Sequence, residues 1–411
     1  MSGRRLVVAA STHSWRPCRR RGSTGTAHAR SPWESRDAVS QLVEPLSSSQ
    51  VHPTSSGRAT TAQARLVGLG LATPKPCFSQ AVIAQRLADL WGLTGQEADR
   101  WQRIVDGSNI DRRHSVVPVE EVMGLSTKQR MESYEHHAPP LAEDAVHCAL
   151  TNAGINAEDV TDLIIVSCTG FSAPGLDIAL IQRFGMPLTV KRTIIGFMGC
   201  FGAINGMRSA VRACLADPDA VVVVVCVELC SLHFRRDVSA QNQVASALFA
   251  DGAAVAIVVG ERIAIDHGRA GIGRLTIGHS RLIPEGRDWM TWRIGDEGFA
   301  MTLTRQVPVI LRKQIASYVA GVAPQRPNCY IVHPGGAGIL DAVDSGLSLQ
   351  GSSGLDSART VLRRFGNMSS CTVLFVLDQV LADGYRLPGL MLAFGPGLSI
   401  ESLAILPDDG G

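Results

Sequence analysis

From Ala64 onward, short apolar runs alternate with stretches that repeat apolar residues every three or four positions. The runs predict strands buried on both faces, and the repeats predict amphipathic helices packed on those strands. The strands are expected at residues 66–71, 163–168, 220–228 and within 247–260, and the helices at 79–93 and at 140–152, before Gly154. Such alternation indicates an α/β fold.

The second half of the chain repeats this order less regularly. It predicts helices at 307–319 and 358–365, a strand that ends at His333, an apolar helix that runs to 377, and strands at 390–394 and 399–406 joined by a hairpin turn. In each half, a candidate functional residue therefore stands at the start of an apolar helix, Cys200 in one half and Asn367 in the other. We expect an internal duplication, with halves at 64–262 and 263–411.

Residues 1–63 have a different composition, rich in Ser, Thr, Arg and Pro, with many arginines but no acidic residue before Glu34. A segment of this composition cannot bury enough apolar surface to become ordered. An organelle transit peptide is also Arg- and Ser-rich and poor in acids, but it carries an amphipathic face that is not evident here. We therefore predict a disordered or over-long N-terminal extension.

Composition and charge limit the classes of partner. The chain has 411 residues, 45% of them hydrophobic, and a formal net charge of +2. This near-neutral balance predicts no nucleic acid partner, and no apolar run reaches the roughly 18 residues of a membrane span. The ten cysteines lack metal-type pairs: Cys226 and Cys230 have no second pair, and Glu135-His136-His137 is more typical of a solvated segment. We expect a soluble, cytoplasmic protein with free cysteines and no metal.

Cys200 is the strongest candidate for chemistry. It stands in Gly199-Cys200-Phe201-Gly202, where an apolar run breaks at glycines and then becomes helical to about residue 216. At a helix N-terminus, unpaired N–H groups and the helix dipole favour the thiolate, the form that attacks thioesters. The alternative is a buried cysteine that packs as a small hydrophobic residue. The flanking glycines favour a site, because they leave room for a ligand to approach.

Two further residues stand at the ends of predicted elements. His333 ends an apolar strand, at the sheet edge where α/β folds commonly place site residues. Asn367 precedes a helix, so its amide could cap that helix or donate to an oxyanion. Each of these residues alone is more often structural. Together with Cys200, they indicate a catalytic site.

Four segments carry a resemblance to a known family: Gly199-Cys200-Phe201-Gly202, Val332-His333-Pro334-Gly335-Gly336, Gly366-Asn367-Met368-Ser369-Ser370 and Phe394-Gly395-Pro396-Gly397-Leu398. From about Ala64 to Leu406 the chain resembles type III polyketide synthases of the chalcone and stilbene synthase family, bacterial type. The resemblance implies a duplicated α/β/α/β/α thiolase-like fold and a homodimer. It also implies that the substrates are an acyl-CoA starter and malonyl-CoA, with no cofactor and no metal.

The resemblance implies a role for each of the three residues. Cys200 would take the acyl group from the starter as a thioester, and His333 would keep the sulfur ionised as its ion-pair partner. Malonyl-CoA would then lose carbon dioxide while His333 and Asn367 donate to the enolate oxygen. The resulting carbanion would attack the Cys200 thioester and lengthen the chain by two carbons.

Four further positions are expected to shape the product cavity. Phe249 and Met301 match the two gatekeepers of the family, and Met301 is a softer side chain than the residue of the plant enzymes. His233 matches a cavity threonine of plant chalcone synthases. Ala173 matches a methionine that those enzymes project into the partner's site. These departures argue against a flavonoid-type product.

Five positions are expected around the substrate. Arg100 and Arg103 match basic residues that hold the CoA phosphates in the family, whereas the third such position is Gly107. Glu228 and Ser369 match residues near the cavity that influence how the chain cyclises.

The predicted function is that of an acyltransferase that extends a long-chain aliphatic acyl-CoA with several malonyl units and forms an alkylpyrone or alkylresorcinol. The fatty starter is inferred from the smaller residues Ala173 and Met301. The alternatives are a synthase with an aromatic starter, a ketoacyl synthase that uses acyl carrier protein for one extension, and a catalytically silent binding protein. Starter, number of extensions and cyclisation mode depend on the cavity, so the sequence leaves them open.

Overall fold

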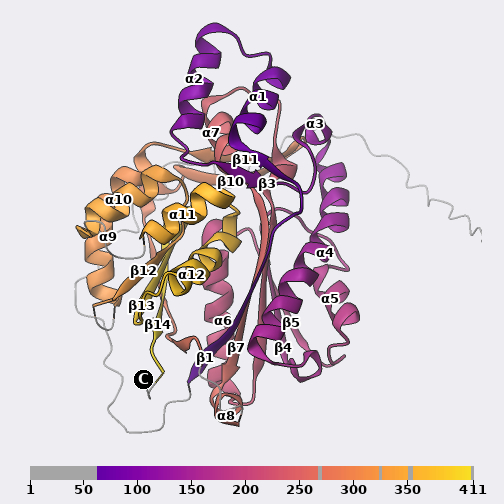
Figure 1. Ribbon diagram of the computed structural model, residues 1–411, viewed down its shortest axis with the longest axis vertical. Helices are drawn as coiled ribbons and strands as arrows, with labels where there is room; N and C mark the ends of the chain where they lie inside the picture. Colours follow the sequence, from indigo (N-terminus) through magenta and orange to yellow (C-terminus); the bar gives the residue numbers. More distant parts are fainter. Residues whose placement is uncertain (1–62, 267–270, 324–325, 350–354, 409–411) are drawn as a thin grey trace, which may run out of the picture. The chain divides into compact units, whose positions relative to one another are not determined.

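The computed structural model describes residues 63–266, 271–323, 326–349 and 355–408. Ten strands of this part of the chain form one sheet in the order β12-β13-β14-β8-β1-β7-β6-β4-β5, and β9 pairs with β14 (Figure 1). Their bounds are Ala64–Ala72 (β1), Asp162–Ser167 (β4), Lys191–Gly196 (β5), Val221–Leu229 (β6), Asp251–Gly260 (β7), Gly273–Leu275 (β8), His279–Leu282 (β9), Cys329–Val332 (β12), Gly389–Gly395 (β13) and Ser399–Leu406 (β14). The N-terminal extension predicted at 1–63 lies outside the described residues, apart from Gln63.

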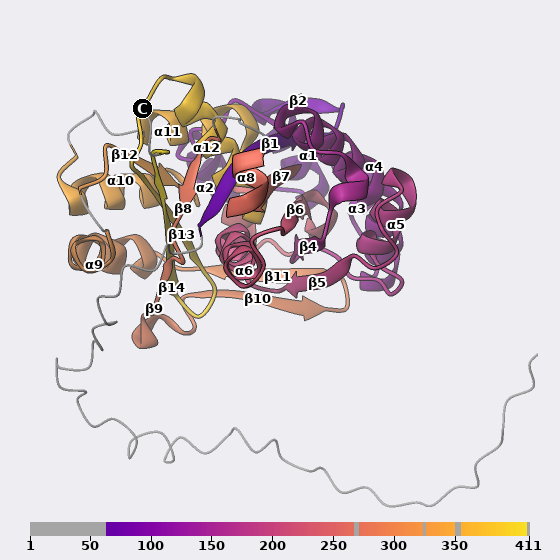
Figure 2. The same ribbon diagram turned by 90° about the horizontal axis from the view of Figure 1, so that it is seen from below.

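The helices flank this sheet (Figure 2). Their bounds are Gln80–Trp91 (α1), Gly95–Asp106 (α2), Val119–Val122 (α3), Thr127–Ala153 (α4), Leu176–Phe184 (α5), Gly202–Ala216 (α6), Ala240–Leu248 (α7), Glu261–Asp266 (α8), Gln306–Val322 (α9), Ala337–Leu347 (α10), Leu355–Phe365 (α11) and Thr372–Ala382 (α12). Short 3₁₀ turns occur at Ala157–Asp159 (η1), Gly199–Phe201 (η2), Cys230–His233 (η3), Pro284–Gly286 (η4) and Ser369–Cys371 (η5). Two separate hairpins pair β2 (Cys77–Ser79) with β3 (Arg112–His114) and β10 (Met290–Gly295) with β11 (Gly298–Leu303).

The two halves of the sequence supply opposite parts of the large sheet. Strands β1, β7, β6, β4 and β5 precede residue 262 in the chain and lie in succession, whereas β8, β9, β12, β13 and β14 all follow it. β4 is parallel to β5 and β6, while β7 runs antiparallel to β1 and β6. A mixed sheet flanked by helices confirms the predicted α/β class.

Strand β6 shows why an uninterrupted apolar run is needed here. All its residues are buried, and successive side chains of a strand point to opposite faces. Its even-numbered residues from 222 to 226 join the core that contains α6 and α12, and its odd-numbered residues from 221 to 227 join the core that contains α4 and α5. Figure 1 shows α6 on one side of these strands and α4 and α5 on the other.

Helix α4 is much longer than the helix predicted at 140–152. It begins at Thr127, where Ser126 and Gln129 form a reciprocal capping box, and it continues through Pro139 and Pro140. The prediction started at Pro140 because proline normally ends or begins a helix. The prolines leave backbone carbonyls one turn earlier without an N–H donor, but Glu135 and His136 are exposed there, so water can reach those carbonyls.

The hairpin of β10 and β11 is not among the predicted elements. Its first strand, Met-Thr-Trp-Arg-Ile-Gly, alternates apolar and polar residues but is short, and its second strand, Gly-Phe-Ala-Met-Thr-Leu, does not alternate. The hairpin lies apart from the large sheet and is only partly buried. Within the described ranges, none of the helices combines the length and the apolar character that crossing a bilayer requires.

Candidate active site

The segment around Cys200 has the predicted strand, turn and helix. β5 leads through Phe197 and Met198 into η2, which contains Cys200, and α6 follows directly. Gly199 adopts a φ of 71°, and a Cβ added there would lie 2.5 Å from Cδ of Pro396. Glycine is therefore required on both conformational and steric grounds. This close approach places the turn between β13 and β14 directly beside the cysteine.

His333 and Asn367 lie at the ends predicted for them. His333 follows β12, and its backbone N–H donates to Leu392 O at 2.8 Å. Asn367 follows α11 after Gly366, which has a φ of 73°. Both side chains are buried. Together with Cys200 they line one narrow cavity of about 10 Å³, so the structure brings together the three residues that the sequence singled out.

Hydrogen bonds fix the amide of Asn367. Its Oδ1 accepts from the backbone N–H of Ser369 at 2.8 Å, and its Nδ2 donates to Gly335 O at 3.4 Å. Asn367 thus caps the η5 turn, which is the structural role that the sequence left open for it. The same bond turns the amide N–H groups toward the cavity. Hydrogen bonds from Ser369 and Asn367 also act on the Cys200 sulfur and favour its ionised form.

Burial dominates the electrostatics of the site. It raises the pKa of the Cys200 thiol to about 12 and lowers the pKa of His333 to about 3, so each group alone favours its neutral form. Among the described residues, neither ring nitrogen of His333 has a hydrogen-bond partner. Proton transfer from Cys200 to His333 would create both charges together and give each a counter-ion. The ion pair inferred from the family resemblance stays a prediction.

Phe249 and Met301 lie in the walls expected for gatekeepers. Both line the cavity of the three candidate residues and a second cavity of about 20 Å³ on the other side of Cys200. Trp292, which the sequence analysis missed, also lines this second cavity. Its Nε1 donates to Cys168 O at 2.8 Å, which holds the indole in place. A space of this size holds about one water molecule.

A buried carboxylate lies behind this wall. Glu228 accepts hydrogen bonds from Thr169 Oγ1 at 2.8 Å, Ser370 Oγ at 2.5 Å and Cys168 N at 3.1 Å. Burial raises its pKa despite these donors. Cys168 Sγ lies 3.3 Å from both Glu228 Oε1 and Ser369 Oγ, so the thiol connects Glu228 with the predicted cavity residue Ser369.

Two of the predicted cavity residues do not line either of these spaces. His233 stacks on Phe299 with 4.1 Å between ring centroids, and its nitrogens contact Thr169 O and Phe299 N. Both nitrogens are therefore used within the fold, and burial lowers the pKa of His233 to about 3. Ala173 lies exposed in the loop before α5. His233 supports the cavity from behind, and Ala173 contributes nothing to the cavity of its own chain.

Basic residues surround a wider opening on the outer side of the site. Arg100 and Arg103 of α2 line a cavity of about 730 Å³ with Arg305, which precedes α9. Arg103 also borders an adjoining cavity of about 310 Å³ that includes Gly107 and reaches Gly335, two residues from His333. The assignment of Arg100 and Arg103 to CoA phosphates stays a prediction. Sequence analysis missed Arg305 because it approaches from an element 200 residues away.

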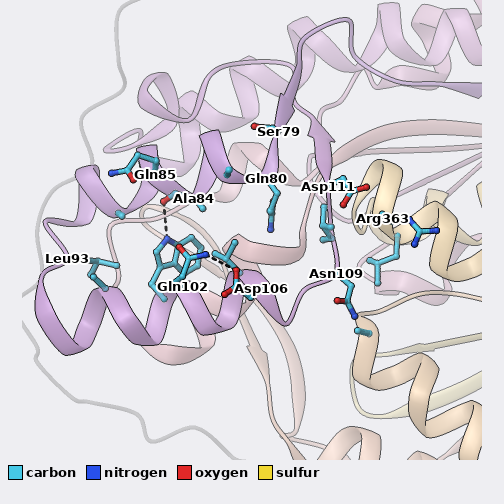
Figure 3. Close-up of a pocket in the computed structure, with 18 of the residues that line it drawn as sticks. Ser79, Gln80, Ala84, Gln85, Leu93, Gln102, Asp106, Asn109, Asp111 and Arg363 are labelled. Atoms are coloured by element: carbon cyan, nitrogen blue, oxygen red, sulfur yellow. Dashed lines mark hydrogen bonds between the residues drawn. The ribbon is translucent and has the colours of Figure 1, made fainter.

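A larger cavity, of about 800 Å³, contains none of the three candidate residues. Figure 3 shows its wall, with Gln85 from α1, Gln102 and Asp106 from α2, and Arg363 from α11. Gln80 reaches into the same wall and has a structural role described below. Within the described part of the chain, no group of three His, Cys, Asp or Glu residues could hold a metal ion.

Comparisons with known proteins agree with this arrangement. The family model described as "Chalcone and stilbene synthases, N-terminal domain" matches residues 51–262, and the corresponding C-terminal domain model matches residues 274–407. A 1,3,6,8-tetrahydroxynaphthalene synthase of Streptomyces peucetius subsp. caesius is 34% identical over 376 residues, covering 89% of this chain and 97% of the relative. The alpha-pyrone synthesis polyketide synthase-like Pks18 of Mycobacterium tuberculosis is 29% identical, with coverages of 84% and 91%.

Solved structures give the same result for the fold. PKS-I of the brown alga Ectocarpus siliculosus superposes with a TM-score of 0.78 at 29% identity, covering 85% of this chain and all of the other. The 1,3,6,8-tetrahydroxynaphthalene synthase of Streptomyces coelicolor A3(2), a bacterial type III polyketide synthase, gives a TM-score of 0.76 at 27% identity, with coverages of 84% and 99%. The predicted thiolase-like fold is confirmed.

Proposed function

Because the chain belongs to the chalcone and stilbene synthase family of type III polyketide synthases, we propose that Cys200, His333 and Asn367 are its catalytic residues. The enzyme transfers acyl groups, and it would extend an acyl-CoA starter with several malonyl-CoA units. The observation that carries this proposal is the shared narrow cavity of the three side chains, which adjoins a cavity lined by Arg103 and Arg305. CoA thioesters would be the only small molecules required.

Each step follows from the chemistry of the site. Cys200 Sγ attacks the starter thioester while His333 accepts the cysteine proton, and His333 returns this proton to the departing sulfur so that CoA leaves as its thiol. When malonyl-CoA loses carbon dioxide, negative charge develops on its thioester oxygen. An N–H of Asn367 and the ring N–H of His333 would donate to that oxygen in a cavity without room for bulk water, where such bonds are strongest. Attack by the enolate carbon transfers the acyl group from Cys200 and frees the sulfur for the next round.

The starter remains part of the proposal. The sequence favours a long-chain aliphatic starter and an alkylpyrone or alkylresorcinol product, because Ala173 and Met301 are small or flexible. A short starter such as acetyl- or malonyl-CoA is a second candidate, because Trp292 leaves only about 20 Å³ beside Cys200. A fatty chain would enter only after Trp292 or Met301 turned away. The geometry as it stands therefore supports the short starter better, and the cyclisation mode, with Glu228 and Ser369 at the cavity wall, stays open.

Turnover with a panel of starters tests this proposal. Acetyl-, butanoyl-, decanoyl-, palmitoyl- and benzoyl-CoA would each be supplied with malonyl-CoA, and products identified by mass spectrometry. We expect the native enzyme to favour the short starters, and Trp292→Gly to raise decanoyl-CoA use at least about tenfold by opening the wall. Ile294→Ala, at an exposed position of the same strand that lines neither cavity, is the matched control. A native enzyme that prefers palmitoyl-CoA would support the long-chain starter predicted from the sequence. A lack of product from every starter would reject the proposed function.

We also propose that the protein is a cytoplasmic homodimer in which Ala173 faces the partner's site. β5 is the last strand in the sheet order, so one of its edges has no neighbouring strand among the described residues. Such an edge can pair with another strand. Apolar side chains are exposed around it, including Leu188 at 96% and Ile194 at 54%. A second copy of the same edge would cover these side chains.

Sedimentation equilibrium measures this association. The native chain of 43.8 kDa is expected to sediment with twice that mass, and Ile194→Lys is expected to sediment as a monomer, because a charge at the covered edge would be desolvated. Ile277→Lys introduces the same charge at another half-exposed isoleucine, away from β5, and should leave the mass unchanged. A native protein that is monomeric at every concentration would contradict the dimer.

A further inference from the structure

Arg113 is a fully buried cation. It lies in β3 with 1% of its surface exposed, and no carboxylate of the described residues comes within ion-pair distance of its guanidinium. Burial lowers its pKa to about 9, and the nearby charge of Asp251 opposes this shift. A buried guanidinium is costly unless its N–H groups are used well. The groups that receive its hydrogen bonds therefore indicate what it does.

Those groups lie at the C-terminal end of α7. One terminal nitrogen of Arg113 donates to Phe249 O and to Ser246 O, both at 2.7 Å. Its Nε donates to Gln80 Oε1 at 2.8 Å, and Gln80 in turn donates to Ala247 O at 2.8 Å. The last carbonyls of a helix lack N–H partners and carry partial negative charge. Arg113 and Gln80 together bind three of these carbonyls and fix the end of α7.

The end of α7 is bonded directly to Asn367. The backbone N–H of Asn367 donates to Leu248 O at 2.9 Å, and Ala250 N–H donates to Asn367 O at 2.9 Å. Arg113 also packs against Gly366, the residue before Asn367, because a Cβ on Gly366 would lie 3.0 Å from Cγ of Arg113. Arg113 thus contacts both of these segments, the one that carries the gatekeeper Phe249 and the one that carries Asn367.

We propose that Arg113 is a positioning residue for the decarboxylation step, an inference that rests on the proposed function. By holding the carbonyls of Phe249 and Ser246, it keeps residues 248–250 in register with Asn367. Asn367 Nδ2 is thereby held where the enolate oxygen forms, and the Phe249 ring is held at the cavity wall. Arg113 does not reach the substrate and acts only through these two residues.

The two partial reactions of the native enzyme separate this role from a general structural one. Acylation of Cys200 depends on Asn367 only through its minor effect on the pKa of the thiol, whereas malonyl-CoA decarboxylation needs the Asn367 amide as an oxyanion donor. Arg113→Lys keeps a cation but cannot reproduce the forked contacts. We expect it to lower kcat for decarboxylation roughly 10- to 100-fold, with KM and the rate of Cys200 acylation changed less than about threefold. Equal loss of both reactions would overturn the proposal.

A double-mutant cycle tests whether Arg113 acts through Asn367. In an Asn367→Ala background, Arg113→Lys should reduce decarboxylation by less than about twofold, because the group that it positions is already absent. Effects that multiply would overturn the proposal. If Arg113→Lys does not fold, Gln80→Leu removes the anchor of the guanidinium and should give the same split between the two reactions at smaller magnitude.

Arg130 provides a matched control. It is also fully buried and also donates to backbone carbonyls, those of Leu232 and Phe234, but it does not contact the chain of Asn367. Arg130→Lys is expected to lower the melting temperature and to affect acylation and decarboxylation equally. The same selective loss of decarboxylation in this variant would overturn the proposal. A native enzyme that performs neither partial reaction would instead reject the proposed function.

Discussion

Replacing Cys200 with alanine is expected to abolish acyl-enzyme formation and to lower polyketide formation by at least about 10³-fold, because no other group can carry the acyl chain between extensions. Chromatography of products formed from acetyl-CoA and malonyl-CoA measures the loss. Decarboxylation of malonyl-CoA should persist within about tenfold of the native rate, since His333 and Asn367 remain in place.

Cys230→Ala is the matched control for this variant. Cys230 is a second buried thiol in the wall of the same cavity, and it packs against Cys200 and Phe249. Burial raises the pKa of Cys230 far above that of an ordinary thiol, and this residue follows a strand instead of preceding a helix. We expect the variant to form acyl-enzyme at close to the native rate. If Cys230→Ala failed to form the acyl-enzyme while Cys200→Ala still formed it, Cys230 would be the nucleophile in place of Cys200.

Removal of either proposed oxyanion donor is expected to slow malonyl-CoA decarboxylation roughly 10²- to 10³-fold, the usual cost of one such donor. For Asn367→Ala the loss should fall mainly on this step. For His333→Ala, acylation should slow as well, because the same ring accepts the Cys200 proton. Release of carbon dioxide from labelled malonyl-CoA measures decarboxylation, and trapping of the acyl-enzyme measures acylation.

Asn367→Asp sharpens this test. The carboxylate matches the amide in shape, but it cannot donate when ionised and would repel a developing enolate. Decarboxylation should therefore fall at least as far as in Asn367→Ala. Asn242→Ala is the control, because Asn242 is a buried asparagine that donates to Asp237 O at the start of α7, away from the cavity. Native decarboxylation in Asn367→Asp would contradict the proposed oxyanion role.

Much of the fold could be predicted because its strands are buried on both faces. A strand such as β6 has no polar residue to obscure the pattern before Glu228, and the site residues stand where such strands or helices end. Cys200, His333 and Asn367 were therefore identifiable from local sequence. The fold brings these three residues into one cavity. The sequence predicted this only through the family resemblance.

The cavity wall could not be predicted in the same way. Trp292 lies on a short hairpin of which only the first strand has a regular apolar pattern, and the bond that holds it joins it to Cys168, 124 positions away. Arg113 likewise has no local signal, because a charged residue in a three-residue strand suggests an exposed position. Its partners at the end of α7 become visible only once the chain is folded.

The local sequence predicts a thiolate at Cys200 from the unpaired N–H groups and the dipole of the following helix, and the family resemblance adds His333 as its ion-pair partner. A dipole contributes only about 0.3–1 kcal/mol at ordinary exposure, and α6 begins two residues after Cys200, beyond the η2 turn. Burial acts more strongly in the opposite direction and raises the pKa of the thiol. In the proposed mechanism, formation of the thiolate therefore depends on His333 as the proton acceptor.

The central claim is that Cys200 carries the growing chain. Its most direct test is peptide mapping of the native enzyme, quenched in acid after brief incubation with radiolabelled acetyl-CoA. We predict one labelled peptide, containing Cys200, with the label released by neutral hydroxylamine as expected for a thioester. A label on any other residue, or a failure to label an enzyme that still forms product, would contradict the account.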